Sequence, residues 1–161
     1  MTPATVRVPG RPVLAIDPGS VRSAWVLLGG GAIRSHGILP NEDLLDWLRT
    51  THATSVIEAI EPRQQPAGRT VIETVRWEGR FMEALSHCPV HLVTRRAVTA
   101  HHVDGGTKDA DKRIRAALID RYGPGSERKG GPLAGIVKDL WSALAIGLYW
   151  ADTHPDEGAG A

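Results

Sequence analysis

The sequence predicts an α/β fold with a five-stranded mixed β-sheet flanked by helices. Three short apolar runs follow one another near the start with hairpin-length links, and helical patterns separate the later apolar runs. Strands joined by hairpins pair antiparallel, so strands one to three are expected to be antiparallel. Strands joined through helices pair parallel, and right-handed crossovers place strand four beside strand one and strand five beyond it.

The first third of the chain supplies three strands and a short helix. The strands are predicted at 13–17, 22–28 and 32–38. Gly29-Gly30-Gly31 predicts a tight hairpin turn between the second and third strands. Asn41 is expected to cap a helix through Arg49, because acids occupy its first turn and three leucines share one face. Those leucines are Leu44, Leu45 and Leu48.

The remainder alternates strands with helices. It is predicted to contain a strand at 55–60, a helix at 70–86, a strand at 90–93, a helix at 108–122 and a final helix at 139–150. The helix at 70–86 is given an apolar stripe of Val71, Val75, Met82 and Leu85. The last helix is expected to dock on the sheet through Trp141, Leu144, Ala145 and Leu148. No element is predicted for 95–107.

Length and composition indicate one ordinary globular domain. The chain has 161 residues, and we expect the domain to span 12–152 with flexible termini at 1–11 and 153–161. No apolar stretch is long enough for a transmembrane helix, and the N-terminus lacks the apolar segment of a signal peptide. Cys88 is the only cysteine, which excludes a disulfide framework and a Cys-rich zinc site and favours a cytoplasmic location. We assign this thiol a buried structural role.

Basic residues are concentrated in one region although the net charge is only +1. Residues 95–129 contain nine Lys and Arg against five acids. Such a region can neutralise nucleic-acid phosphates, but a solvated helix face would give a similar count.

Three acids form the candidate site. Asp17 ends the first apolar run before Pro-Gly, and the alternative is a simple Asp-Pro-Gly turn. Glu58 lies within an apolar strand, where a carboxylate needs a cation, a metal or a wet edge. Glu61 follows three residues later, is expected on the opposite face and ranks second. Asp139 begins the last helix, and its alternative role is an N-cap.

Converging carboxylates, with no Cys pair and no clustered His ligands, favour a hard cation such as Mg²⁺ or Mn²⁺. Two such ions about 3.5–4 Å apart can hold the attacking water and the leaving oxygen of a phosphoryl displacement. The sequence contains no Walker loop, no G-x-S-x-G elbow and no H-E-x-x-H helix, so it indicates no rival chemistry of those kinds.

Four ordered groups of residues resemble a known family. They are 15–20 (AIDPGS); 56–58 (VIE) with Gly68 and 73–81 (ETVRWEGRF); 108–112 (KDADK) with 117–124 (ALIDRYGP); and 131–133 (GPL) with 138–145 (KDLWSALA). In this order they resemble the RuvC-type branch of the RNase H-like nucleases, the crossover (Holliday) junction endonucleases, particularly short phage and prophage members. The resemblance covers about residues 12–150. It implies an RNase H-like fold, a homodimer, and divalent-metal hydrolysis of branched DNA such as four-way junctions.

The resemblance also implies roles for individual residues. Asp17, Glu58 and Asp139 fall on the family's metal-binding acids, which hold two ions per active site. Lys112 falls where relatives carry a basic residue facing DNA. Further candidate phosphate contacts are Lys108, Arg115 and Arg63.

Two positions depart from the family. Ser142 stands where many relatives have a fourth acid, which implies that one ion is held less tightly or through water. Glu61 stands where cellular resolvases have a junction-stacking aromatic residue, so junction specificity is less secure than nuclease activity.

Two rival functions follow from the residues. One is a non-catalytic RNase H-like nucleic-acid-binding module, for which Ser142 is the best argument. A nuclease that acts on other branched or flap DNA is a variant of the predicted junction endonuclease. The other is an actin-like phosphotransferase, whose first strand also ends in Asp-x-Gly. That class needs two lobes around a nucleotide, whereas 161 residues supply one.

Overall fold

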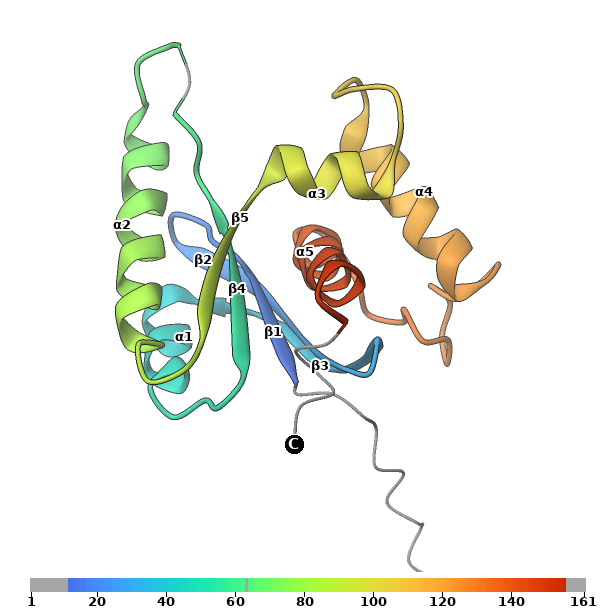
Figure 1. Ribbon diagram of the computed structural model, residues 1–161, viewed down its shortest axis with the longest axis horizontal. Coiled ribbons are helices and arrows are strands. Elements are labelled where there is room, and N and C mark those ends of the chain that lie inside the picture. The colour runs from blue at the N-terminus through green and yellow to red at the C-terminus, as the bar shows by residue number, and fades with distance from the viewer. Residues whose placement is uncertain (1–11, 63, 156–161) are drawn as a thin grey trace, which may run out of the picture.

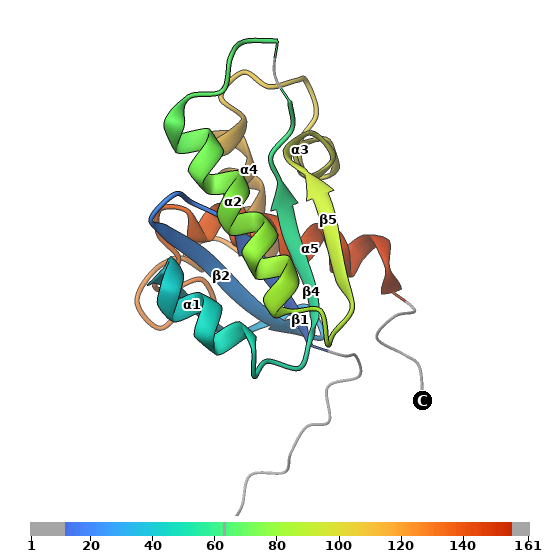
Figure 2. The same cartoon turned by 90° about the vertical axis from the view of Figure 1, so that its left-hand side faces the viewer.

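The computed structural model describes residues 12–62 and 64–155. A central sheet has α1 and α2 on one face and α5 on the other, and α3 and α4 pack on α5 (Figure 1). The quarter-turned view shows α1 and α2 in front of the sheet and α5 behind it (Figure 2). The strands are β1 (Val13–Asp17), β2 (Arg22–Gly29), β3 (Ala32–Pro40), β4 (Thr54–Ala59) and β5 (Val90–Thr94). The helices are α1 (Asn41–Leu48), α2 (Arg69–Ala84), α3 (Arg95–His102), α4 (Ala110–Tyr122) and α5 (Leu140–Thr153).

The strand order is β3-β2-β1-β4-β5, as the hairpins and right-handed crossovers predict. β1 to β3 are antiparallel, and β1, β4 and β5 are parallel. The β2–β3 turn uses Gly30 and Gly31 at φ of 61° and 78°, a conformation that glycine adopts without steric cost. Tyr122 at the end of α4 donates its hydroxyl to the Gly31 carbonyl oxygen at 2.9 Å, which ties the hairpin to α4.

Alternation along the strands divides the core into two layers. Ala15 and Val56 pack beneath α5, whereas Ile16 and Ile57 pack beneath α1 and α2. The predicted docking residues of the last helix are all buried, which confirms its orientation: Trp141, Leu144, Ala145 and Leu148. None of the helices in the described ranges is long and apolar enough to cross a membrane.

Two helices differ from the prediction. α3 was not predicted, because its sequence, RRAVTAHH, has too few apolar residues to show a helical period. It begins where the Thr94 hydroxyl accepts a hydrogen bond from the Ala97 backbone N–H at 3.1 Å. In α2 the predicted stripe is wrong at its start: Val71 and Val75 are 40% and 45% exposed, and Thr74 is buried instead.

The C-terminal boundary also differs from the prediction. α5 continues to Thr153, and the ring of His154 stacks on Trp150 with centroids 3.5 Å apart. The chain therefore stays packed beyond the expected limit at 152. The predicted flexible stretches 1–11 and 156–161 lie outside the described residues.

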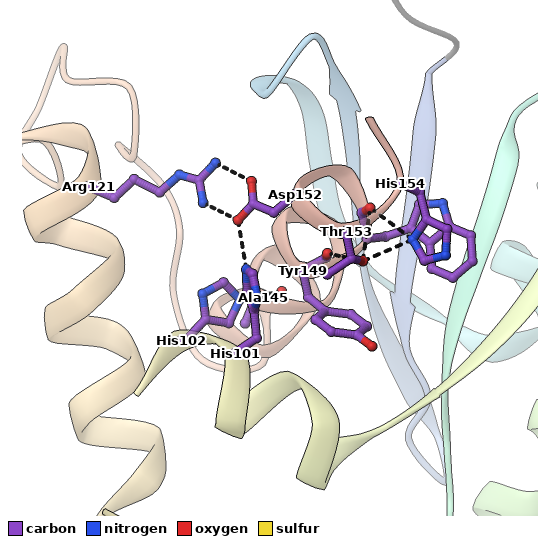
Figure 3. Close-up of polar contacts among 9 residues, drawn as sticks. His101, His102, Arg121, Ala145, Tyr149, Asp152, Thr153 and His154 are labelled. Carbon is purple, nitrogen blue, oxygen red and sulfur yellow. Dashed lines mark hydrogen bonds and ion pairs between the residues drawn. The ribbon is translucent and has the colours of Figure 1, made fainter. Parts of the chain in front are cut away.

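The carboxylate of Asp152 links α5 to α3 and α4 (Figure 3). Asp152 on α5 accepts two hydrogen bonds from Arg121 on α4, at 2.6 and 2.8 Å, and lies 2.8 Å from His101 on α3. These contacts, chiefly the hydrogen bonds from Arg121, lower the pKa of Asp152 to about 2. The side chain is 27% exposed, so this cluster is partly shielded from water.

Asp152→Asn should destabilise the protein by about 1 kcal/mol at pH 7, after allowance for partial solvent screening, or about 2–4 °C in Tm. Because the folded-state pKa is depressed, this contribution is present above about pH 4 and is lost as the pH falls toward 2. Thermal unfolding of both proteins at pH 7, 4 and 3 checks this. Asp46→Asn is the control, because its ion pair with Arg49 is exposed and should contribute little. A Tm difference that is unchanged at pH 3 would contradict the assignment.

Candidate active site

Asp17 and Glu58 lie side by side at the carboxyl ends of two adjacent parallel strands. Ile16 on β1 is paired with Ile57 on β4, and each acid is the next residue along its strand. Because the isoleucines face α1 and α2, strand alternation directs both carboxylates to the opposite face, toward α5. Glu58 is only 7% exposed.

Asp139 approaches from the N-terminus of α5 on that same face. It occupies the N-cap position, but its side chain makes no capping hydrogen bond. Lys138 immediately before it has φ of 50°, a left-handed conformation uncommon for a residue with a side chain. The carboxylate is therefore available to the pocket rather than used by its own helix. Asp139 and Glu58 line a pocket of about 440 Å³ with Asp111, Ser142 and Arg95.

Burial and neighbouring charges raise the pKa values of Asp17 and Glu58. Burial, and then the nearby charge of Glu58, raise the pKa of Asp17 from 3.8 to about 8, and Asp139 and Asp111 add to this effect. Burial also raises the pKa of Glu58, although Arg95 opposes that shift. Carboxylates that repel one another in a cleft form a site that a cation would stabilise.

Arg95 is the site residue that the sequence pattern missed. Its Nε lies 3.1 Å from Glu58 Oε1, and its Nη1 lies 3.1 Å from Asp111 Oδ1. It is the first residue of α3, directly after β5, which lies beside β4. The predicted strand order contained this signal, because the residue after strand five must lie near the end of strand four. Asp111, from the first turn of α4, likewise adds a carboxylate that was not anticipated.

The donor set fits a hard divalent cation. Carboxylate oxygens are the ligands that Mg²⁺ and Mn²⁺ prefer. Within the described residues, the oxygens of Asp17, Glu58 and Asp139 do not all come within 4.8 Å of one another. In this arrangement Glu58 is paired with Arg95. An ion would therefore compete with Arg95 for Glu58.

A hydrogen-bond network fixes the turn after Asp17. The Gly19 N–H donates to Ser23 Oγ at 3.0 Å, Ser23 donates to Asn41 Oδ1 at 2.6 Å, and Asn41 Nδ2 donates to the Gly19 carbonyl at 2.9 Å. Asn41 is thus not the cap that its position suggested: it is the first residue inside α1, and its side chain serves this turn. The network positions the backbone directly beyond Asp17.

Gly19→Ala should disrupt this turn and reduce the affinity of the site for a divalent cation by about tenfold or more, because the supporting geometry is lost. An added Cβ would lie 2.1 Å from the Arg22 carbonyl oxygen, which is backbone and cannot rotate away. Gly79→Ala is the control: its Cβ meets nothing within 4 Å, and alanine should stabilise α2 by about 0.5–1 kcal/mol. Thermal unfolding and metal titration of both variants check this. Equal behaviour of the two variants would show that the turn does not need glycine.

The other predicted residues are distributed around the pocket. Lys112 and Arg115 line it, and the Arg115 guanidinium lies 5.1 Å from the centre of the Trp141 ring. Ser142, in the first turn of α5, also lines it. Lys108 is exposed in the loop before α4, and Arg63 lies outside the described residues.

The prediction that Glu61 lies on the opposite face of the strand is wrong, because Glu61 lies beyond the strand. β4 ends at Ala59, so the alternation used to put Glu61 on the opposite face does not extend to it. The side chain is exposed and lines an adjoining pocket of about 750 Å³ that Glu58 also borders. Its charge contributes to the raised pKa of Glu58. Between them, Ile60 donates its N–H to Glu78 on α2 at 3.1 Å, which fixes the chain as it leaves the strand.

No protein-family profile matches the sequence, and no curated protein matches it. The solved structures that are similar to this chain include two of RuvC. One is Thermus thermophilus RuvC in complex with a Holliday junction substrate, with 15% identity, a TM-score of 0.58, and coverage of 92% of this chain and 97% of that chain. The other is a Thermus thermophilus RuvC structure, with 17% identity, a TM-score of 0.52, and coverage of 88% and 96%. The chain therefore has an RNase H-like fold that is structurally similar to RuvC over most of its length.

Proposed function

We propose that this protein is a divalent-metal-dependent endonuclease that cuts branched DNA and resolves four-way junctions. The observation on which this rests is that Asp17 and Glu58 lie at adjacent strand ends, with the pKa of Asp17 raised to about 8, and that Glu58 and Asp139 line one pocket. The similarity to RuvC, one of whose structures holds a Holliday junction, supports the choice of substrate.

In this proposal Asp17, Glu58 and Asp139 hold two Mg²⁺ or Mn²⁺ ions. When bound, such ions activate a water molecule for attack on phosphorus and stabilise the departing 3′ oxygen. Arg95 keeps Glu58 paired until a cation binds, and is then free to contact a phosphate oxygen. Ser142 lines the pocket where relatives have a fourth acid, and Asp111 adds a carboxylate to the same lining. No side-chain nucleophile is required.

The test is a cleavage assay on labelled four-way, Y-shaped and linear duplex DNA, in Mg²⁺, in Mn²⁺ and in EDTA. We expect metal-dependent cuts placed symmetrically in the four-way junction and little cutting of linear duplex. Cutting of Y-shaped or flap DNA alone would retain the nuclease and remove the junction specificity. No cutting of any substrate in either metal would contradict the proposed activity.

Binding to DNA should depend strongly on salt through α4. Replacing Lys112 and Arg115 together by Ala removes two phosphate contacts beside the pocket, and should lower the log–log salt slope by about 2. Replacing Arg49 and Arg80 by Ala is the control, because Arg49 directly follows α1 and Arg80 lies on α2, on the other face of the sheet from α5. Fluorescence anisotropy between low and moderate salt measures both slopes. Equal slopes for the two double variants would mean that α4 does not face the DNA.

A homodimer is part of the proposal, because two symmetric nicks require two active sites related by a two-fold axis. α5 is buried along most of its length, so it leaves little surface for an interface. α2 has an exposed apolar surface instead: Val71, Ile72 and Val75 are 40%, 44% and 45% exposed. Sedimentation at micromolar concentration decides, since a species of 17.3 kDa with and without junction DNA would refute the dimer.

A second candidate is a nucleic-acid-binding module without turnover. Ser142 and the ion pair between Arg95 and Glu58 favour it, because they leave fewer free carboxylates for metal. Junction binding that is tight in EDTA, combined with no cleavage in Mg²⁺ or Mn²⁺, would identify this module.

A further inference from the structure

A second group of metal-ligand side chains lies at the opposite end of the sheet. A ring nitrogen from each of His52 and His87 and the sulfur of Cys88 all lie within 4.8 Å of one another. The sequence shows no such cluster, because these residues are 35 positions apart and in different loops. The chain has seven histidines and one cysteine, and the fold brings that cysteine together with two of the histidines.

Parallel pairing of β4 with β5 causes this convergence. His52 lies in the loop before β4, and His87 and Cys88 lie in the loop before β5. Ser55 donates its N–H to the Pro89 carbonyl at 2.9 Å, which holds the starts of the two strands together. The cluster is therefore about 15–20 Å from Asp17 and Glu58, roughly the length of a strand of this size.

Thr51 already holds two of the three side chains in place. Its carbonyl oxygen lies 2.7 Å from His87 Nε2 and accepts a hydrogen bond from Cys88 Sγ at 3.3 Å. The rings of His52 and His87 meet edge to face, with centroids 5.2 Å apart. The three residues line a pocket of about 190 Å³ with Pro12, Ala53 and Pro89. Both histidines are exposed, so the His52 ring can rotate toward an entering ion, and Cys88 is half-buried rather than fully buried as predicted.

We propose that His52, His87 and Cys88 form a binding site for Zn²⁺. Imidazole and thiolate ligands suit Zn²⁺ and not the hard cations that carboxylates hold. In a tetrahedral site the ligand atoms are about 3.4–3.8 Å apart, so the three side chains need to close by no more than about 1.4 Å. The fourth position goes to water or to the Thr51 carbonyl oxygen. Bound Zn²⁺ joins the two loops and stabilises the fold, independently of the proposed nuclease function.

Co²⁺ titration of the full-length protein, reduced with a non-thiol reductant, tests the site. We expect thiolate-to-metal charge-transfer absorption that saturates at one Co²⁺ per chain and that Zn²⁺ abolishes. Cys88→Ser should remove the absorption, and His52→Gln and His87→Gln should each weaken binding by about tenfold or more. Zn²⁺ should raise the Tm of the wild type and not that of Cys88→Ser.

Asp17→Asn is the matched control, because it alters the carboxylate site and leaves this cluster intact. Its absorption and its affinity should equal those of the wild type. Absence of charge-transfer absorption at stoichiometric Co²⁺ would overturn the proposal. Unchanged affinity in the double variant His52→Gln, His87→Gln would also overturn it, because the thiol alone would then be responsible.

Discussion

Asp17→Asn should reduce metal-dependent cleavage of branched DNA by about 100-fold or more while junction binding persists. The amide keeps the shape of the side chain at the end of β1 but lacks the charge that attracts a divalent cation. Loss of a preorganised electrostatic contact to reacting groups typically costs 10²–10³ in rate. Single-turnover cleavage and anisotropy on the same four-way junction measure the two properties. Cleavage near the wild-type rate would remove Asp17 from the site.

The same substitution has an effect on stability that does not depend on cleavage. Because the pKa of Asp17 is about 8 in the folded protein and ordinarily 3.8, only the folded state holds this proton between those values. The metal-free wild type should therefore lose stability as the pH rises from about 4 to 8, and Asp17→Asn should lose less. At pH 8 in EDTA the variant should have the higher Tm, and Mg²⁺ should raise only the wild-type Tm.

Much of the fold was predictable, because its determinants are local in sequence. Hairpin-length links and intervening helices specify which strands pair antiparallel and which pair parallel. The strand order, together with the position of Asp17 at the end of the first strand, predicted that Asp17 lies beside Glu58. The position of Asp139 on the same side of the sheet was predictable, because the apolar residues of α5 specify which face of the helix docks on the sheet.

The features that the sequence pattern missed depend on contacts between distant segments. Asn41 has the residue type of a helix cap, but Ser23 and Gly19 lie close enough to take its side chain. The sequence does not distinguish Arg95 from the other basic residues of 95–129. Its role follows from the start of α3, which places it beside Glu58. No sequence motif marks His52 and Cys88 as neighbours. They lie close together only because β4 and β5 pair in parallel.

The choice between Glu58 and Glu61 shows how far local reasoning reaches. Both border the same pocket, and the alternation argument ends with β4 at Ala59. Burial separates them instead: Glu58 is 7% exposed and paired with Arg95, whereas Glu61 is exposed. A carboxylate held rigidly in a strand and screened from water binds a cation with less reorganisation than one in a solvated loop.

Glu58→Gln should therefore reduce cleavage by about 100-fold or more, and Glu61→Gln should change it by less than about threefold. The glutamine keeps the size of the buried side chain, so loss of activity reports loss of charge rather than collapse of β4. Loss of this partner should also free Arg95, and junction binding in EDTA should become equal to or tighter than that of the wild type. Single-turnover cleavage in Mg²⁺, with far-ultraviolet circular dichroism to verify folding, decides between the two acids. The reverse pattern, with Glu61→Gln inactive and Glu58→Gln active, would mean that the metal lies beyond the end of β4, in the pocket that Glu61 borders.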